Sequence, residues 1–523
     1  MDLTRVRSWS PPGSGAPIET EVLILGGGIN GVGVFRELAA NGVNVILAEK
    51  DDFTAGATSA SSRMIHGGLR YMEQGEFRLV RESLRERNRL LQHAPGHVLP
   101  LPTTIPLFSR WSGILNAMEK FVRGNSQPSQ RGTHLVKLGL SLYDAFSGRD
   151  RVLPRHRMAS KREALAKRPL LNPAVVGTAT YYDAWVAMPE RLCLEYLADA
   201  LSQHAGAVAL NYCPAVGISS DGLVQLRKTS PGGGDFLVEP RVVINATGAW
   251  IDLTNASLGG KTHSVGGTKG SHLILDHPRL HQELAGEQIF YENEDGRICI
   301  CFPLFDKVLV GSTDIRIDNP DEAVCTDEEV DYILASVKGV FPALELGREH
   351  VVSRYCGVRP LPASETGFTG RISRDHSCRK SPPSEAHPWP VFSLIGGKWT
   401  TFQAFAEQVA DQVLREIESP RQGFPREQAP AFSPTPDFGN EADLREILTR
   451  EAVVHLDDFL LRRTPLALCE RLSSERFEFL ANLAAGALGW DQQRLTQERD
   501  RTLEILFRRH GVTLSSSPSS PKS

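Results

Sequence analysis

The sequence has no excess of basic residues: 58 Lys and Arg stand against 62 Asp and Glu, a formal net charge of −4. Proteins whose main partner is nucleic acid carry a basic excess, so the composition disfavours that class. No apolar run approaches the ~18 residues of a membrane-spanning helix. Residues 1–20 lack the apolar core of a secretory signal. With 41% hydrophobic and 23% charged residues over 523 positions, we expect a soluble globular protein of two or three units.

Cysteine usage also excludes some kinds of site. The eight cysteines contain no Cys-x-x-Cys pair, a spacing common in zinc and dithiol sites. Cys299 and Cys301 are two positions apart in an apolar stretch, so both would point to one face of a strand. We therefore expect reduced, mostly buried thiols in a cytosolic protein, and no metal site.

Residues 21–50 have the pattern of a dinucleotide-binding unit. An apolar run, a glycine-rich turn, a helix-period segment and a second apolar run follow one another, and the key positions are Gly26, Gly28 and Gly31 in G-x-G-x-x-G spacing and Glu49 after the second run. Gly26 allows the tight turn, Gly28 lets the backbone approach a pyrophosphate, and Gly31 lets helix and strand pack closely. The helix N-terminus supplies N–H groups to the phosphates. Glu49 suits an adenosine ribose hydroxyl and would repel a 2′-phosphate, so NADP is disfavoured.

A second glycine-rich element lies far downstream, at residues 393–401. Gly396 and Gly397 end an apolar run and precede a helix-period segment, with Thr400 and Thr401 placed to cap that helix and Lys398 to reach a ligand. Two such elements at opposite ends of one region indicate a long cofactor that lies across a sheet. This geometry suits a flavin better than a nicotinamide cofactor, for which a second dinucleotide-binding unit would be expected.

Several residues between and beside these elements are suited to binding an anion. The stretch 57–87 begins with small hydroxylated residues that could line a cofactor and continues to His66, Arg70 and Tyr71 around a Gly-Gly pair. Three more cations, in loop-like or glycine-rich contexts, are Arg359, Arg374 and Lys398. Each arginine alone is an ordinary surface charge. Gathered in one pocket, they would bind phosphate in bidentate geometry.

One region is locally basic. Between residues 103 and 168, 13 Lys and Arg stand against four acids. Within it, residues 107–124 place Trp111 and other apolar side chains at near-helical spacing beside Arg110, Lys120 and Arg123. Such a helix can lie in a bilayer surface next to anionic headgroups. An ordinary surface helix that packs on the core is an equally good interpretation of the same pattern.

These motifs together resemble a known family. The strings GGGINGVG, ATSASSRMIHGGLRY, YYDAWV, NATGAW, KGSHLIL, VGSTDI, GVRPL, ISRD and GGKWTT occur in the order found in FAD-dependent, quinone-reducing glycerol-3-phosphate dehydrogenases. The resemblance extends from about Val22 to about Phe405. After YYDAWV the family usually continues with acidic residues, whereas this chain has Ala187, Met188 and Pro189 before Glu190.

The resemblance assigns roles to individual residues. FAD would contact Gly26, Gly28, Gly31, Glu49, Thr58, Ser59, Ser61, Ser62, His66, Ala246, Thr247, Gly248, Gly397 and Thr400. The substrate would meet Arg70, Tyr71, Arg359, Arg374 and Lys398. His272, in KGSHL, would be a general base of near-neutral pKa, and Arg359 and Lys398 would stabilise the developing alkoxide.

The implied reaction is oxidation of sn-glycerol 3-phosphate to dihydroxyacetone phosphate, with hydride passing from C2 to flavin N5 and electrons then passing to membrane quinone. The enzyme would be cytoplasmic and peripherally bound to the inner face of the cytoplasmic membrane, and residues 110–131 would contact the membrane or the second subunit of a homodimer. Three alternatives stay open: another polyol phosphate such as an erythritol phosphate, oxygen as the acceptor, or a flavin-binding redox sensor without turnover.

The expected fold class is α/β, with a glutathione-reductase-type FAD-binding fold, an inserted mixed-sheet substrate domain and a helical C-terminal domain. The FAD-binding parts would be about 20–100, 170–258 and 353–419, and the substrate-domain parts about 101–169 and 259–352. A Pro-rich linker would cover 420–439 and the helical domain 440–510. Residues 1–19 and 511–523 are predicted to be disordered.

Overall fold

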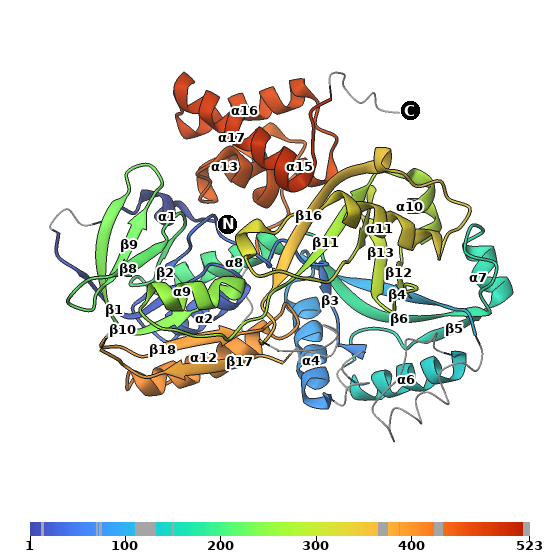
Figure 1. Cartoon of the computed structure of the whole chain (residues 1–523), viewed down its shortest axis with the longest axis horizontal. Helices are drawn as coiled ribbons and strands as arrows, with labels where there is room; N and C mark the ends of the chain where they lie inside the picture. The colour runs from blue at the N-terminus through green and yellow to red at the C-terminus, as the bar shows by residue number, and fades with distance from the viewer. Residues whose placement is uncertain are drawn as a thin grey trace.

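The computed structural model describes residues 1–11, 15–69, 72, 76–109, 132–148, 151–363, 375–385, 387–422 and 432–515. It consists of two large sheets side by side, with the C-terminal helices above them in Figure 1. Arg70, Tyr71, Arg374 and the basic segment 110–131 lie outside the described residues.

The first sheet is the dinucleotide-binding sheet, in the order β17-β18-β10-β1-β2-β7, with β9 paired to β10 and β8 to β9. Strands β18, β10, β1, β2 and β7 run parallel, and β17, β8 and β9 are joined antiparallel. The bounds are β1 Ile18–Leu25, β2 Val45–Ala48, β7 Val208–Leu210, β8 Ala215–Ile218, β9 Val224–Lys228, β10 Gly234–Asn245, β17 Ser377–Ser381 and β18 Val391–Ile395.

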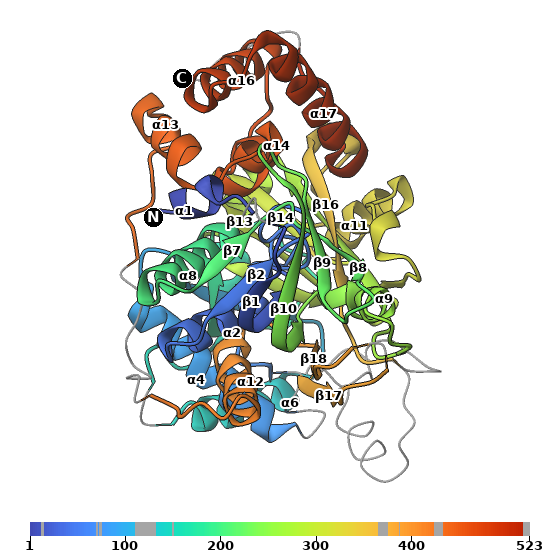
Figure 2. The same ribbon diagram turned by 90° about the vertical axis from the view of Figure 1, so that its left-hand side faces the viewer.

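Helices cover this sheet because its strands are apolar on both faces. Strand β1 is buried from Val22 to Leu25, as expected for a strand with parallel neighbours on each side. Helix α2 packs against α8 and α12, which lie near it in Figure 2. The three helices share one apolar core. The helices here are α2 Ile29–Ala40, α8 Pro189–Gln203, η1 Gly248–Trp250, α9 Ile251–Ser257 and α12 Phe402–Glu416.

The second sheet is mixed, in the order β15-β11-β14-β13-β12-β4-β6-β3, with β16 beside β11 and β5 beside β6. The β4–β12 pair is parallel and the other pairs are antiparallel. The bounds are β3 Met64–Ile65, β4 Val98–Leu107, β5 Arg157–Ser160, β6 Gly177–Val186, β11 Thr268–Leu275, β12 Gln288–Glu292, β13 Ile298–Leu304, β14 Lys307–Gly311, β15 Ile315–Arg316 and β16 Val351–Arg359. Its helices are α4 Phe77–His93, α6 Thr133–Phe146, α7 Lys161–Lys167, α10 Pro278–Leu284, η2 Pro320–Glu322, α11 Asp327–Lys338 and η3 Arg348–His350.

The C-terminal helices pack on the second sheet and are tied by ion pairs to the first. Their apolar side chains share a core with Ile274, Phe302 and Leu309 of that sheet. Buried Arg463 donates to both oxygens of Asp52, at 2.7 and 2.8 Å, and buried Arg191 pairs with Glu451 at 2.8 Å. The elements are α13 Glu441–Arg450, α14 Leu456–Asp458, the π-helical turn η5 Phe459–Arg463, α15 Leu466–Cys469, α16 Ser474–Leu488 and α17 Gln492–His510.

The fold class is confirmed, but some boundaries differ from those expected. Strands β6 and β16 belong to the second sheet, although 170–258 and 353–419 are predicted as FAD-binding parts. The reason is that β6 pairs along its whole length with β4, and β16 pairs with β11.

The predicted disorder of residues 1–19 is also wrong in part. Helix α1 (Thr4–Ser8) lies within this segment, and Leu3 and Val6 are buried in the core. The Leu3 N–H donates to the carbonyl of Arg450 at 2.7 Å, which anchors the N-terminal residues to α13. At the other end, Ser515 forms a β-bridge with Ser473. Residues at both ends of the described part of the chain thus make short backbone contacts that composition does not reveal.

Candidate active site

The first glycine turn has the geometry that its spacing predicts. Gly26 has φ +110°, and a Cβ there would lie 2.6 Å from the carbonyl oxygen of Ala246. A Cβ on Gly31 would overlap the carbonyl of Gly26, so helix α2 can approach the turn only with glycine at this position. Gly28 is the N-cap of α2, and Thr58 Oγ accepts from the Ile29 N–H at 3.0 Å. The turn therefore has the close backbone packing at the N-terminus of α2 that a pyrophosphate-binding turn requires.

Glu49 follows β2 and is held beside this turn. Its carboxylate accepts from the N–H groups of Gly27 at 2.6 Å and Asp51 at 3.0 Å. Burial raises the pKa of Glu49 to about 7, although these two backbone N–H groups act in the opposite direction. Its position suits an acceptor for a ribose hydroxyl.

The second glycine element contacts the first. Gly396 and Gly397 have φ of +75° and +82°, and Asn30 in the first turn of α2 donates from Nδ2 to the carbonyl of Gly396 at 3.0 Å. A Cβ on Gly397 would overlap the Asn30 side chain. Thr401 is the N-cap of α12, but its side chain does not cap the helix as predicted. The Thr400 hydroxyl is buried without a hydrogen-bond partner among the described residues, which fits a hydroxyl that faces a bound group.

The hydroxyl-rich loop and the turn after β10 complete the cofactor side. Ser59 Oγ donates to the carbonyl of Gly56 at 3.2 Å, and Ser61 Oγ accepts from the Arg63 N–H at 3.2 Å. Thr247 Oγ donates to Asn245 Oδ1 at 2.6 Å, which fixes the turn through Ala246 and Gly248. These groups, the glycine cradle and the lone Thr400 hydroxyl fit FAD.

A cavity of about 350 Å³ lies between the two sheets. Among the predicted residues, its lining includes Ser61, Ser62, His66, His272, Arg359, Gly397, Lys398 and Thr400. Leu69 and Asp375 also line it, and they are the chain neighbours of Arg70 and Arg374. The structure thus brings the predicted catalytic residues into the same cavity as the second glycine element, whereas Gly26, Gly28 and Gly31 of the first element do not line it.

His272 is buried in β11, with Tyr355 of β16 stacked on its ring at 5.1 Å between centroids. Its Nε2 lies 2.8 Å from Ser62 Oγ, and its Nδ1 has no hydrogen-bond partner among the described residues. Burial lowers the pKa of His272 to about 3, with Arg359 and Arg63 acting in the same direction. This value is well below the near-neutral pKa that the sequence predicts, so the ring is neutral at physiological pH, and burial disfavours its protonated form.

Arg359 ends β16 and its guanidinium is fixed from one side. It donates to Asp314 at 3.0 Å, to Ser312 Oγ at 3.1 Å and to the carbonyl of Thr313 at 3.3 Å. A Cβ on Gly270 would overlap this guanidinium, so the glycine before Ser271 makes room for it. Asp314 and Gly270 lie in the quoted strings VGSTDI and KGSHLIL, but only the sheet register shows that both serve Arg359.

Two buried acids support the loop that carries His66. Asp183 in β6 accepts from the Gly67 N–H at 3.1 Å, and also from Arg87 and Tyr143. Glu190, in the segment that departs from the expected pattern, pairs with buried Arg63 at 3.1 Å. Arg63 in turn follows Ser62, so this ion pair holds the hydroxyl-rich loop in place.

The two sheets, the two glycine turns and the cavity between them define a FAD-binding oxidoreductase. A family model described as FAD dependent oxidoreductase matches residues 21–411, and the chain belongs to this family. Its cofactor is therefore FAD.

Similar proteins narrow the relationship. The chain is 37% identical over 414 residues to a glycerol-3-phosphate dehydrogenase from Synechocystis sp., which covers 76% of this chain and 70% of that protein. It is 33% identical over 398 residues to a D-erythritol 1-phosphate dehydrogenase from Brucella abortus, and this alignment covers 75% of this chain and 73% of that protein. The solved glycerol-3-phosphate dehydrogenase of Bacillus halodurans, complexed with FAD, shares the fold with a TM-score of 0.68 at 21% identity. The superposition covers 94% of this chain and 95% of that chain. The resemblance to the glycerol-3-phosphate dehydrogenases is thus confirmed.

Among the described residues, no helix combines the length and the apolar character needed to cross a bilayer.

Proposed function

We propose that the protein oxidises sn-glycerol 3-phosphate to dihydroxyacetone phosphate. The observation that carries this proposal is the shared cavity, in which a neutral, buried His272 and the fixed guanidinium of Arg359 lie together with the Gly396–Gly397 turn. Relatives named as glycerol-3-phosphate dehydrogenases support the choice of substrate. Oxidation of a secondary alcohol needs a base for the hydroxyl proton and an acceptor for the hydride.

His272 is the proposed base. Its imidazole would take the proton of the C2 hydroxyl, and Ser62 Oγ and the stacked Tyr355 ring hold the imidazole in position. The dianionic phosphate of the substrate would oppose the two arginines that depress the pKa of His272, and so strengthen the base when substrate is bound.

Arg359 and Lys398 are the proposed stabilisers of the C2 oxygen as negative charge develops. The hydrogen bonds from Arg359 to Asp314 and Ser312 fix the guanidinium before substrate binds, so little reorganisation is needed during the reaction. Bound FAD supplies the hydride acceptor at N5. The glycine turns, Glu49 and the hydroxyl-rich loop would hold it across the first sheet.

The phosphate would be anchored by Arg70, Tyr71 and Arg374, which lie outside the described residues and are assigned from sequence alone. Two cations that bind the phosphate would hold the substrate in one orientation, with C2 in position for the reaction. Quinone is the proposed final acceptor, with the protein at the inner face of the cytoplasmic membrane through the basic segment 110–131. A homodimer is proposed on the same sequence grounds.

A second candidate substrate is an erythritol phosphate. The relative from Brucella abortus, a D-erythritol 1-phosphate dehydrogenase, matches nearly as much of the chain, and the cavity of about 350 Å³ has room for a longer polyol. The same base and phosphate anchor would serve both substrates.

The test is anaerobic flavin bleaching of the purified protein with glycerol 3-phosphate, erythritol phosphates and glycerol. We expect rapid loss of flavin absorbance with glycerol 3-phosphate and none with glycerol, which lacks the phosphate. Faster bleaching by an erythritol phosphate would keep the mechanism and change the substrate. A flavin-loaded protein that none of them bleaches would overturn the proposal and favour a redox sensor.

A further inference from the structure

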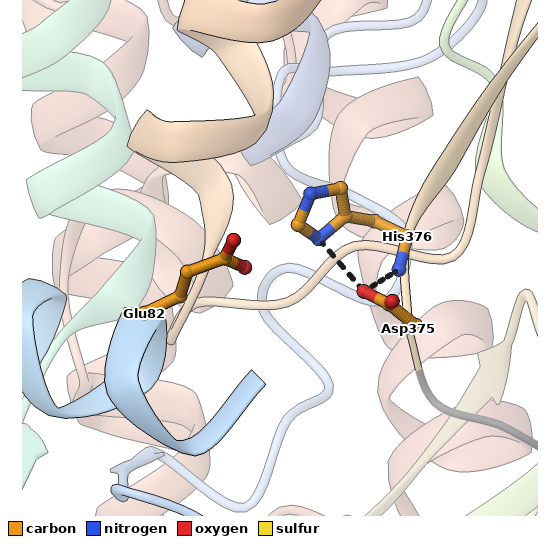
Figure 3. A group of neighbouring side chains, drawn as sticks. All are labelled: Glu82, Asp375 and His376. Atoms are coloured by element: carbon orange, nitrogen blue, oxygen red, sulfur yellow. Dashed lines mark hydrogen bonds and ion pairs between the residues drawn. The ribbon is translucent and has the colours of Figure 1, made fainter. Parts of the chain in front are cut away.

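Glu82, Asp375 and His376 form a cluster beside the active-site cavity. Glu82 comes from α4, and the other two residues precede β17. One potential ligand atom from each residue lies within 4.8 Å of the others. Figure 3 shows the two carboxylates and the imidazole directed toward one another from these separate segments.

The histidine presents a lone pair to the two acids. Its side chain is 1% exposed, and its Nε2 lies 3.3 Å from Gln408 Oε1 of α12. Because an amide oxygen only accepts, the proton is on Nε2 and Nδ1 is the unprotonated nitrogen. Burial lowers the pKa of His376, although Asp375 acts in the opposite direction. Nδ1 has no hydrogen-bond partner among the described residues and lies 3.7 Å from Asp375 Oδ1.

Glu82 also has an atom without a partner. Its Oε1 accepts from Arg78 at 2.7 Å, whereas its Oε2 is buried without a hydrogen-bond partner among the described residues. Arg78 also pairs with Asp375 and is 58% exposed, so it compensates the two acids from the solvent side. Two buried electron-pair donors, Glu82 Oε2 and His376 Nδ1, thus remain in one cluster, and native proteins rarely leave such groups unsatisfied.

We propose that Glu82, Asp375 and His376 bind a divalent first-row transition metal ion, with Zn²⁺ as the best match. One imidazole and two carboxylates suit such ions, whereas Mg²⁺ and Ca²⁺ prefer oxygen ligands alone. The hydrogen bond from His376 Nε2 to Gln408 is the contact that commonly orients a metal-binding histidine. Bonds of about 2.0–2.1 Å place tetrahedral ligands roughly 3.3 Å apart, so the side chains must close slightly around the ion.

A bound ion would connect α4 to the cofactor side of the cavity. Asp375 lines that cavity, and a Cβ on Gly396 would lie 2.9 Å from the Asp375 carbonyl oxygen, so the two segments touch. The ion would therefore join α4, the start of β17 and the neighbourhood of the second glycine turn. Binding to the folded state alone also raises its stability, in proportion to the logarithm of the ion concentration.

The test is calorimetric titration of chelator-treated, FAD-loaded protein with zinc chloride, together with thermal unfolding with and without zinc. We expect one equivalent to bind and to raise the unfolding temperature. Glu82→Gln and His376→Gln should each weaken binding by more than the roughly 10- to 100-fold that loss of a histidine's outer hydrogen-bond partner costs. Arg78→Gln should tighten binding, because it removes the cation that competes for both carboxylates.

His156→Gln is the matched control. His156 pairs with Asp144 at 2.7 Å, away from this cluster, and its loss should leave zinc binding unchanged. If His376→Gln does not fold, Glu82→Gln carries the test, because this carboxylate lies on a partly exposed helix face. Failure of the wild type to bind zinc, wild-type binding by Glu82→Gln, or weaker binding by Arg78→Gln would each overturn the proposal.

Discussion

His272 Nε2 lies 2.8 Å from Ser62 Oγ, which joins β11 of the second sheet to the hydroxyl-rich loop of the cofactor side. Tyr355 stacks on the same ring and donates its hydroxyl proton to the carbonyl of Ser61 at 2.9 Å. The imidazole is thus held by one contact from the loop and one from a neighbouring strand, which is itself hydrogen-bonded to the loop. This arrangement fixes the orientation of a base without supplying it with a charge partner.

Replacement of His272 by Gln should slow flavin reduction by glycerol 3-phosphate by roughly 10²–10⁴-fold, because the C2 hydroxyl loses its base. FAD content should not change. Anaerobic stopped-flow absorbance measures both. Ser62→Ala should have a smaller effect, since it removes only the contact that orients the ring; an equal rate in His272→Gln and wild type would rule out the assigned role.

The pH dependence should reflect the low pKa of His272. Because burial and Arg359 hold this pKa near 3, the neutral base persists as pH falls from 8 to 5, and kcat/KM should show no acid limb from this group over that range. Arg359→Met removes a cation that lowers the pKa, so its acid limb should move to higher pH relative to wild type. Because both enzymes are assayed with the same substrate, titration of the substrate phosphate affects the two pH profiles equally. Arg297→Met, at the same cavity, is the control, and a shift equal in both variants would contradict the assignment.

Gly397→Ala should weaken FAD binding by about ten- to a hundred-fold, because strained left-handed backbone costs on the order of 1–3 kcal/mol. The backbone φ is +82°, and the new methyl group would overlap Asn30. Flavin fluorescence during dialysis measures the loss. Gly486→Ala, in α16 with open space around it, is the matched control and should retain FAD; equal retention in the two variants would show that the turn is not at the cofactor.

Asp52→Asn should destabilise the fold by about 3–5 kcal/mol at pH 7, the usual cost of breaking a buried ion pair. Burial alone would raise the pKa of Asp52, but Arg463 and Arg462 lower it to about 2. A folded-state pKa below the unfolded value of about 3.9 stabilises the protein above that pH, and the contribution is lost as pH falls toward 2. Denaturant unfolding measures the difference in free energy of unfolding between wild type and Asp52→Asn, and this difference should become smaller from pH 4 to 2. Exposed Asp221→Asn should unfold with the same free energy as wild type at every pH. A difference for Asp52→Asn that does not change with pH would contradict the account.

The double substitution Arg110→Glu with Lys120→Glu should release the protein from anionic liposomes, because it reverses two charges of the basic segment. Co-sedimentation with vesicles measures the bound fraction. Unchanged partitioning would indicate an ordinary surface helix.

The dinucleotide-binding turn was predictable because local geometry imposes it. Close backbone contacts around the β-turn-α unit require glycine at positions 26 and 31. Any sequence that forms the same turn therefore has glycines at the same spacing. Candidate residues such as His272 and Arg359 came from the family resemblance, and the cavity brings them together.

Long-range partners were not predictable. Asp314 and Gly270 shape the surroundings of Arg359 only through the register of β11, β15 and β16. The pKa of His272 depends on burial and on two arginines distant in sequence, so its low value could not follow from KGSHL alone. The cluster of Glu82 with Asp375 and His376 joins segments almost 300 residues apart and has no sequence spacing to reveal it.

The most direct test of the central claim is anaerobic flavin reduction by glycerol 3-phosphate that carries deuterium at C2. If hydride leaves C2 for the flavin, bleaching should be slower with this substrate than with the unlabelled one, and deuterium at C1 should have no such effect. Equal rates for the C2-labelled and unlabelled substrates, or slowing by the C1 label instead, would contradict the proposed reaction.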